Sequence, residues 1–322
     1  MAPADAILAT PSNVCLPAGS FLVEDADEEI FLLYMEKQKS VLADDGLGSV
    51  TSNEDMIPIS ISVQERAVAS GEKGSYVERS AKGKKAKKER KQVTVELELY
   101  QDLGSLRNRP GDTGSVLWRV SLHLAKYILA QHHFPPPQRL FPTWSTGSVL
   151  ELGSGTGFLG LAIGSTVKSW TFSDQLASLD LLLRNRRKNA KVGEPPLGLV
   201  REVDWIDESL EAARLAANPN SSNRTTEDAP FPDFIVAADC IYNPAISVPL
   251  ARTIDNLAGP QTVALVASEL RDNEPLELFL REWLRLGWTV ARLIFPPEEQ
   301  DGIGSLRFVV WVGWKEKARS NN

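Results

Sequence analysis

From residue 115 onward, short apolar runs alternate with stretches of helical periodicity. Helical patterns lie at 115–131, 157–165, 175–190, 207–217, 246–257 and 274–286. Apolar runs typical of buried strands lie between them at 148–152, 169–173, 198–204, 233–239 and 261–268. Because most of these strands are followed by a helix, consecutive strands should be parallel in one sheet, with helices on both faces. The sequence therefore predicts an α/β fold.

The C-terminal part breaks this alternation. Two β-rich runs, at about 288–295 and 305–314, are joined by a segment rich in proline and glycine that contains no helical pattern. Adjacent strands with a short connection pair antiparallel. Together with the five strands before them, they predict a mostly parallel sheet of seven strands with an antiparallel final strand.

The N-terminal part has another pattern. A helix is predicted at 26–42, with acidic residues near its start, where the helix dipole favours negative charge. Apolar residues alternate at 57–63 and 93–99, which predicts an antiparallel β-hairpin. We therefore divide the chain into an N-terminal extension, 1–112, and a second domain, 113–318.

Charge is unevenly distributed along the chain. The basic loop 82–91 holds seven basic residues and one acidic residue, a net charge of +6. Since the net charge of the whole chain is −7, the remaining residues together carry −13. An acidic body is a poor binder of phosphate groups and suits a basic partner. For the basic loop itself, a solvated loop, a nuclear localisation signal and a contact with ribosomal RNA all remain open.

Cysteine count and hydropathy limit the environment of the protein. Cys15 and Cys240 are too few for a disulfide framework, which predicts a reducing compartment, the cytoplasm and also the nucleus. No apolar run reaches the roughly 18 residues of a transmembrane helix. The first residues lack a basic segment before an apolar run, so no signal peptide is expected. No set of cysteines and histidines has metal-ligand spacing.

The most informative motif is the glycine-rich turn Val149–Gly157, at the junction of a strand and a helix. Gly153, Gly155 and Gly157 alternate there. Glycine lets the backbone approach a ligand closely, and the start of a helix offers free N–H groups. An ordinary strand-to-helix turn is the alternative, but three alternating glycines favour a site for a nucleotide-like ligand.

Two cofactors fit this turn to different degrees. Gly155, Gly157 and Gly160 match the G-x-G-x-x-G pattern of dinucleotide sites, and Asp174 lies where a ribose-binding acid belongs, so an NAD-dependent dehydrogenase is one candidate. However, Glu151 at the end of the strand is unfavourable beside a pyrophosphate and favourable beside a cationic sulfonium. The form Glu-x-Gly-x-Gly-x-Gly resembles seven-strand methyltransferases that use S-adenosyl-L-methionine.

Three further motifs narrow the resemblance. Gly114-Ser-Val-Leu-Trp118 precedes the first strand, Val203-Asp-Trp-Ile-Asp207 follows the third, and Ala237-Ala-Asp-Cys-Ile-Tyr242 ends the fourth. With the glycine turn, they resemble the protein-lysine methyltransferases related to methyltransferase-like 21, most closely the ribosomal lysine N-methyltransferase 5 branch. The resemblance covers about 113–314. It implies a Rossmann-like class I methyltransferase sheet and methylation of a lysine in a large-subunit ribosomal protein.

The resemblance also implies roles for single residues. Trp118 would close over the cofactor, Asp174 would hold the ribose, Trp205 would lie by the adenine and Ala238 near the adenosine. The methionine portion would be lined by Glu151, Gly153, Ser154 and Gly155. Simpler alternatives are a packing role for either tryptophan and N-capping of the next helix by Asp174.

Asp239 and Tyr242 form the acidic-x-x-aromatic element that the family carries at the mouth of its lysine channel, so the resemblance implies catalytic roles for both. A buried acid that caps the next loop is the alternative for Asp239. Arg119 departs from the family pattern, since a smaller or acidic residue is expected after Trp118.

At the level of function, the resemblance implies a protein substrate, no DNA substrate and no membrane partner, and we expect a monomer. Methylation of another non-histone protein and a non-catalytic docking module that binds the cofactor are the alternatives.

Overall fold

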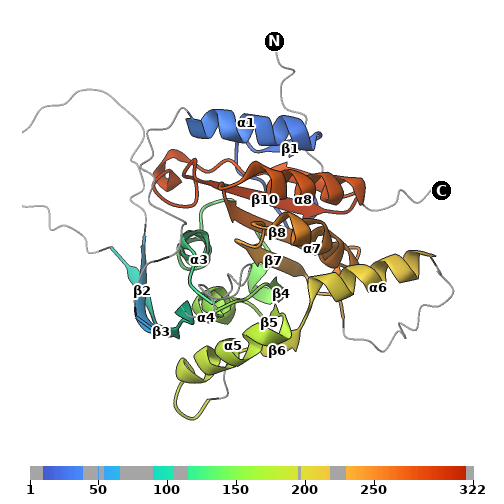
Figure 1. The fold of residues 1–322 in the computed structure, drawn as a ribbon. Coiled ribbons are helices and arrows are strands. Elements are labelled where there is room, and N and C mark those ends of the chain that lie inside the picture. Colours follow the sequence, from blue (N-terminus) through green and yellow to red (C-terminus); the bar gives the residue numbers. More distant parts are fainter. Residues whose placement is uncertain are drawn as a thin grey trace, which may run out of the picture.

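A mixed β-sheet forms the centre of the protein (Figure 1). The computed structural model describes residues 10–38, 50, 54–65, 90–103, 115–194, 197–217 and 230–316. In this part of the chain the sheet has eight strands, in the order β1-β9-β10-β8-β7-β4-β5-β6. They are β1 (Phe21–Val23), β4 (Ser148–Leu152), β5 (Ser169–Asp174), β6 (Leu199–Glu202), β7 (Phe234–Ala238), β8 (Val263–Glu269), β9 (Thr289–Arg292) and β10 (Phe308–Trp314).

Helices connect these strands and cover both faces of the sheet, as the alternation predicts (Figure 1). They are α1 (Ala26–Gln38), α3 (Arg119–His133), α4 (Phe158–Ile163), α5 (Leu176–Lys188), α6 (Trp205–Ala217), α7 (Pro244–Leu257) and α8 (Asn273–Arg285). None of the helices in the described ranges is long and apolar enough to cross a membrane.

The predicted fold class is confirmed. β4 to β8 pair in parallel, and β10 is antiparallel to both β8 and β9. The N-terminal segment adds one strand that the sequence did not predict: β1 pairs antiparallel with β9 at the edge of the sheet. With only three residues, β1 is too short to show an alternating pattern.

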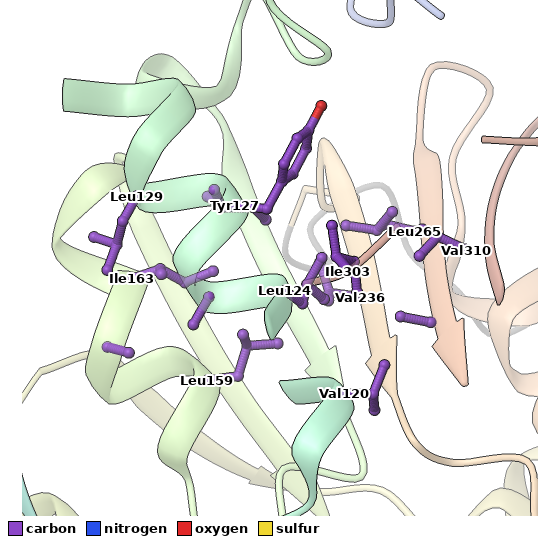
Figure 2. Packing of buried hydrophobic residues seen from close by; sticks show 14 of the residues in the cluster. Val120, Leu124, Tyr127, Leu129, Leu159, Ile163, Val236, Leu265, Ile303 and Val310 are labelled. Atoms are coloured by element: carbon purple, nitrogen blue, oxygen red, sulfur yellow. The ribbon is translucent and has the colours of Figure 1, made fainter. Parts of the chain in front are cut away.

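Side chains alternate between two apolar clusters along each central strand. In β7, Phe234 and Val236 belong to the cluster of α3 and α4, whereas Ile235 and Ala237 belong to the cluster of α1, α7 and α8. Figure 2 shows part of the first cluster, in which Leu124 of α3 lies beside Val236 of β7. Leu265 of β8 and Val310 of β10 belong to the same cluster. A strand buried on both faces has a continuous apolar sequence, which explains why these strands were readily predicted.

The predicted hairpin is also confirmed: β2 (Met56–Gln64) and β3 (Gln92–Tyr100) pair antiparallel over nine residues. The basic loop, apart from Arg90 and Lys91, lies outside the described residues, as does the predicted end of the first helix beyond Gln38. The hairpin packs on α5 and α3, at the lower left of Figure 1.

Two asparagines of α5 join the hairpin to the domain. The Asn185 side chain accepts a hydrogen bond from the Tyr100 N–H (2.7 Å) and donates to the carbonyls of Tyr100 (3.0 Å) and Thr156 (2.9 Å). One turn later, Asn189 makes the same pair of bonds with the backbone of Glu98. These amides satisfy the free edge of β3 and tie it to the turn that follows β4.

We expect Asn185→Ala to lower the free energy of unfolding by about 3 kcal/mol, because it leaves buried backbone groups without partners. Asn185 is fully buried, whereas Asn189 is half-buried and its bonds lie near solvent. Asn189→Ala is therefore the matched control, with an expected loss of about 1 kcal/mol. Denaturant unfolding measures both. If both variants lost the same free energy of unfolding, the hydrogen bonds of Asn185 would contribute no more than those that Asn189 makes near solvent.

Candidate functional site

A pocket opens at the carboxyl ends of β4, β5 and β7, where open α/β sheets bind their ligands. Its empty volume is about 990 Å³, open solvent at its mouth included. All ten site residues predicted from the sequence line it: Trp118, Glu151, Gly153, Ser154, Gly155, Asp174, Trp205, Ala238, Asp239 and Tyr242. Within the described part of the chain, no group of three or more His, Cys, Asp or Glu side chains could hold a metal ion.

The glycine turn forms the floor of this pocket and needs glycine for steric reasons. Gly153, Gly155 and Gly157 have φ values of 65°, 52° and 78°, a left-handed conformation that residues with a side chain rarely adopt. A Cβ atom on Gly153 would lie 2.7 Å from the Cys240 sulfur, and one on Gly157 would lie 2.6 Å from Leu182. The turn therefore has no room for a side chain at Gly153 or at Gly157.

Asp174 holds the glycine turn against the end of β5. Its carboxylate accepts hydrogen bonds from the backbone N–H groups of Gly155 (2.7 Å) and Gln175 (2.8 Å), and the residue is 8% exposed. The N-cap of α5 is Gln175, not Asp174, so the helix-capping alternative does not account for this acid. Asp174 also lines the pocket, so the carboxylate that holds the turn lies at the surface where a ligand would bind.

Glu151 is a buried acid on the other side of the turn. Its Oε2 accepts a hydrogen bond from the Trp170 indole N–H (3.0 Å), and no lysine or arginine of the described residues forms an ion pair with it. Burial raises the pKa of Glu151 to about 8. A buried carboxyl group without a cationic partner is costly to ionise, so a cationic ligand fits beside it.

Trp118 and Trp205 both line the pocket. Trp118 is extended (φ −102°, ψ 144°) and is the N-cap of α3, which starts four residues later than the sequence predicted. The Gln101 side chain accepts a hydrogen bond from the Leu117 N–H (3.1 Å). This bond keeps residues 115–118 out of the helix. Trp205 is the first residue of α6, and its ring lies 3.0 Å from the Cβ position of Gly153.

β7 ends at Ala238, and Asp239 and Tyr242 lie in the segment that follows it. Asp239 has a φ of 60°. Among the residues that the structure describes, it is the only one other than glycine with a positive φ. A hydrogen bond from its N–H to the Ala267 carbonyl (2.8 Å) holds this conformation, which aspartate tolerates better than most residues. The strained backbone turns the Asp239 carboxylate towards the end of β8. Strain of this kind tends to persist at functional sites.

The partner of Asp239 was not predicted from the sequence. Arg271, just beyond β8, donates to both Asp239 oxygens, at 2.8 and 2.5 Å, and to Glu269 at 3.2 Å. Arg119, which departs from the family pattern, pairs with Glu269 at 2.9 Å. Glu269 and Arg271 come after the apolar strand predicted at 261–268, at the edge of the sheet where α/β folds bind ligands. This position in the sequence was the signal that could have marked them as site residues.

Comparison with known proteins identifies the family. The model of the family described as "Lysine methyltransferase" matches residues 100–282, more than half of the chain. The protein belongs to this family. The match includes every site residue named above, from Trp118 to Arg271.

Individual relatives are more distant. METTL21A of Xenopus tropicalis, a protein N-lysine methyltransferase, is 25% identical over 63% of this chain and 79% of its own. EEF2KMT of Homo sapiens, a protein-lysine N-methyltransferase, is 29% identical over 59% of this chain and 57% of its own. A diaminohydroxyphosphoribosylamino-pyrimidine deaminase of Schizosaccharomyces pombe is 33% identical over 57% of this chain. The chain spans only 41% of that deaminase and less than two thirds of EEF2KMT.

Membership of the family confirms the resemblance to proteins related to methyltransferase-like 21 and the prediction of S-adenosyl-L-methionine over NAD. The pocket fits this cofactor, since a buried Glu151 without a cationic partner suits a ligand that carries ammonium and sulfonium groups. When bound, the cofactor supplies an electrophilic methyl group.

We expect Glu151→Gln to stabilise the cofactor-free protein above pH 8 while weakening its affinity for S-adenosyl-L-methionine. Because the pKa of Glu151 is raised in the folded state, its stabilising effect is present at low pH and is lost as pH rises towards about 8. Thermal unfolding of both proteins between pH 6.5 and 8.5 measures this. The melting temperature of wild type should fall more than that of Glu151→Gln, and parallel curves would contradict a buried, ionisable Glu151.

Proposed function

We propose that the protein is an S-adenosyl-L-methionine-dependent protein-lysine N-methyltransferase whose catalytic unit is 113–318. The observation that carries this proposal is a single pocket whose lining combines the glycine turn with Asp239 and Tyr242. Membership of the family and the similarity to the lysine methyltransferases METTL21A and EEF2KMT support the same activity.

In this proposal, different residues of the pocket bind the methionine portion and the adenosine portion of the cofactor. Glu151, with the backbone of residues 153–155, binds the charged methionine portion. Asp174 binds the ribose hydroxyls through the oxygens that already hold the glycine turn. Trp205 and Ala238 line the adenosine portion, and Trp118 covers the cofactor from the start of α3.

The substrate half must bind a lysine side chain and remove its proton. A lysine ammonium has a pKa of about 10.4, and only the neutral amine attacks the methyl group. An enclosed, aromatic-walled channel lowers that pKa by desolvation, and Tyr242 and Trp118 supply aromatic walls at the mouth. Asp239 orients the incoming ammonium. The remaining barrier is the alignment of nitrogen, methyl carbon and sulfur, which binding provides.

For the substrate, we propose a basic protein, and the resemblance to ribosomal lysine N-methyltransferase 5 favours a protein of the large ribosomal subunit. The residues outside the basic loop 82–91 carry a net charge of −13, which supports a basic partner. Another non-histone protein is the alternative. We further propose that the protein acts as a monomer in the cytoplasm or nucleus.

Calorimetric titration of the purified protein with S-adenosyl-L-methionine and, separately, with NAD tests this proposal. We expect micromolar binding of the first and none of the second. Incubation with large-subunit ribosomal proteins and a labelled methyl donor should then yield methyllysine. Cofactor binding without transfer to any protein would favour the docking module instead, and NAD binding alone would overturn the proposal.

A further inference from the structure

Asp239, which lines the pocket, already binds a cation, the guanidinium group of Arg271. Besides its bonds to Asp239 and Glu269, the guanidinium carbon lies 4.8 Å from the centre of the Trp118 ring. Two carboxylates and an aromatic face are the groups that bind an organic ammonium ion in proteins. The same arrangement therefore fits the ammonium of a lysine side chain, the substrate group of the proposed function on which this inference rests.

The cation site opens into the cofactor pocket, because Trp118 and Asp239 belong to both. They line the pocket together with Tyr242, and Arg271 reaches Asp239 from the loop between β8 and α8. The Asp239 side chain is only 1% exposed and the Glu269 side chain 7%, whereas that of Arg271 is 24% exposed. The carboxylates are thus fixed inside the protein, and the cation approaches them from the solvent side.

The carboxylates stay in place without Arg271. Asp239 is held by its own backbone bond to Ala267, and its Oδ1 also accepts the Glu269 N–H (3.2 Å). The charge of Glu269 remains compensated by Arg119 at 2.9 Å. Only Asp239 needs a replacement cation, since a buried carboxylate without a partner costs several kcal/mol.

We propose that Arg271 is an internal competitor for the substrate: its guanidinium occupies the cation site of Asp239, Glu269 and Trp118, and the substrate ammonium must displace it. The exchange replaces one cation by another, so Asp239 keeps a partner while the ammonium binds. A substrate without a cationic side chain cannot complete the exchange, and Arg271 then keeps the site closed. Arg271 is in this way a specificity-determining residue.

The n-butylammonium ion, which has the length and charge of a lysine side chain, serves as the probe. It is titrated into ¹⁵N-labelled protein saturated with S-adenosylhomocysteine, and the Trp118 indole N–H resonance reports binding. If Arg271 occupies the site more than nine tenths of the time, Arg271→Gln should tighten binding at least about tenfold. Arg271→Met, of similar length and without charge, should give the same gain.

Three controls make this result specific. Arg281→Gln removes an arginine of α8 that pairs with Asp27 and Glu277 on the surface, and it should bind the probe as wild type does. The double variant Asp239→Asn, Arg271→Gln should lose the gain. Thermal unfolding verifies that each variant is folded.

The opposite outcome is equally clear. If Arg271 only positions Asp239, removing it leaves probe binding unchanged or weaker, and either result overturns the proposal. Failure of the proposed function is seen separately, because wild-type protein would then not bind S-adenosyl-L-methionine or would transfer no methyl group.

Discussion

Replacing Asp239 by asparagine is expected to slow methyl transfer by about 100-fold, the cost of misaligning a reacting group, while affinity for S-adenosyl-L-methionine stays within about threefold of wild type. Asparagine keeps the shape of the side chain and tolerates φ 60°, so the backbone after β7 is preserved. What it removes is the charge that orients the substrate ammonium. Labelled methyl transfer and cofactor titration measure the two effects.

Asp207→Ala is the matched control for Asp239. It removes an exposed carboxylate from the first turn of α6, close to the pocket but not lining it. Its transfer rate should equal that of wild type. Unchanged turnover in Asp239→Asn would show that the carboxylate plays no part in the reaction, and an equal loss of cofactor affinity would move Asp239 into the cofactor site.

The fold could be predicted where apolar patterns are long and buried on both sides. The strand at 148–152 was predicted with the bounds of β4, because Val149, Leu150 and Leu152 each face one of the two clusters. The start of α6 was predicted two residues late: the Asp204 side chain accepts the Ile206 N–H at 2.8 Å and so begins the helix at Trp205. Boundaries depend on single side-chain bonds of this kind, which a hydropathy pattern does not contain.

The cofactor half of the site could be predicted because it is encoded locally. The glycine turn and Glu151 are consecutive in sequence, and Asp174 ends the next strand, so neighbouring strands bring them together. Arg271 and Glu269 could not be assigned in the same way. Their contacts with Asp239 and Arg119 join residues 32 and 150 positions apart. The pairing of β8 with β7 brings Arg271 to Asp239, and the packing of α3 on β8 brings Arg119 to Glu269.

The strongest effect on cofactor binding is expected for Asp174→Ala, which should weaken the affinity for S-adenosyl-L-methionine by about 100-fold. Two hydrogen bonds from ribose hydroxyls to a carboxylate are worth about 1.5 kcal/mol each at least, and 3 kcal/mol corresponds to a factor of about 100 in the dissociation constant. The variant also frees the N–H groups of Gly155 and Gln175, so it should lower thermal stability.

Loss of fold and loss of ribose contacts must therefore be separated. Asp180→Ala removes an exposed carboxylate from the same helix, α5, and should leave affinity and stability unchanged. Adenine or methionine alone, which lack the ribose, should have the same weak affinity for Asp174→Ala as for wild type. Adenosine should bind Asp174→Ala much more weakly than it binds wild type. If adenosine binds both proteins equally, Asp174 acts only on the glycine turn, and its carboxylate does not contact the ribose.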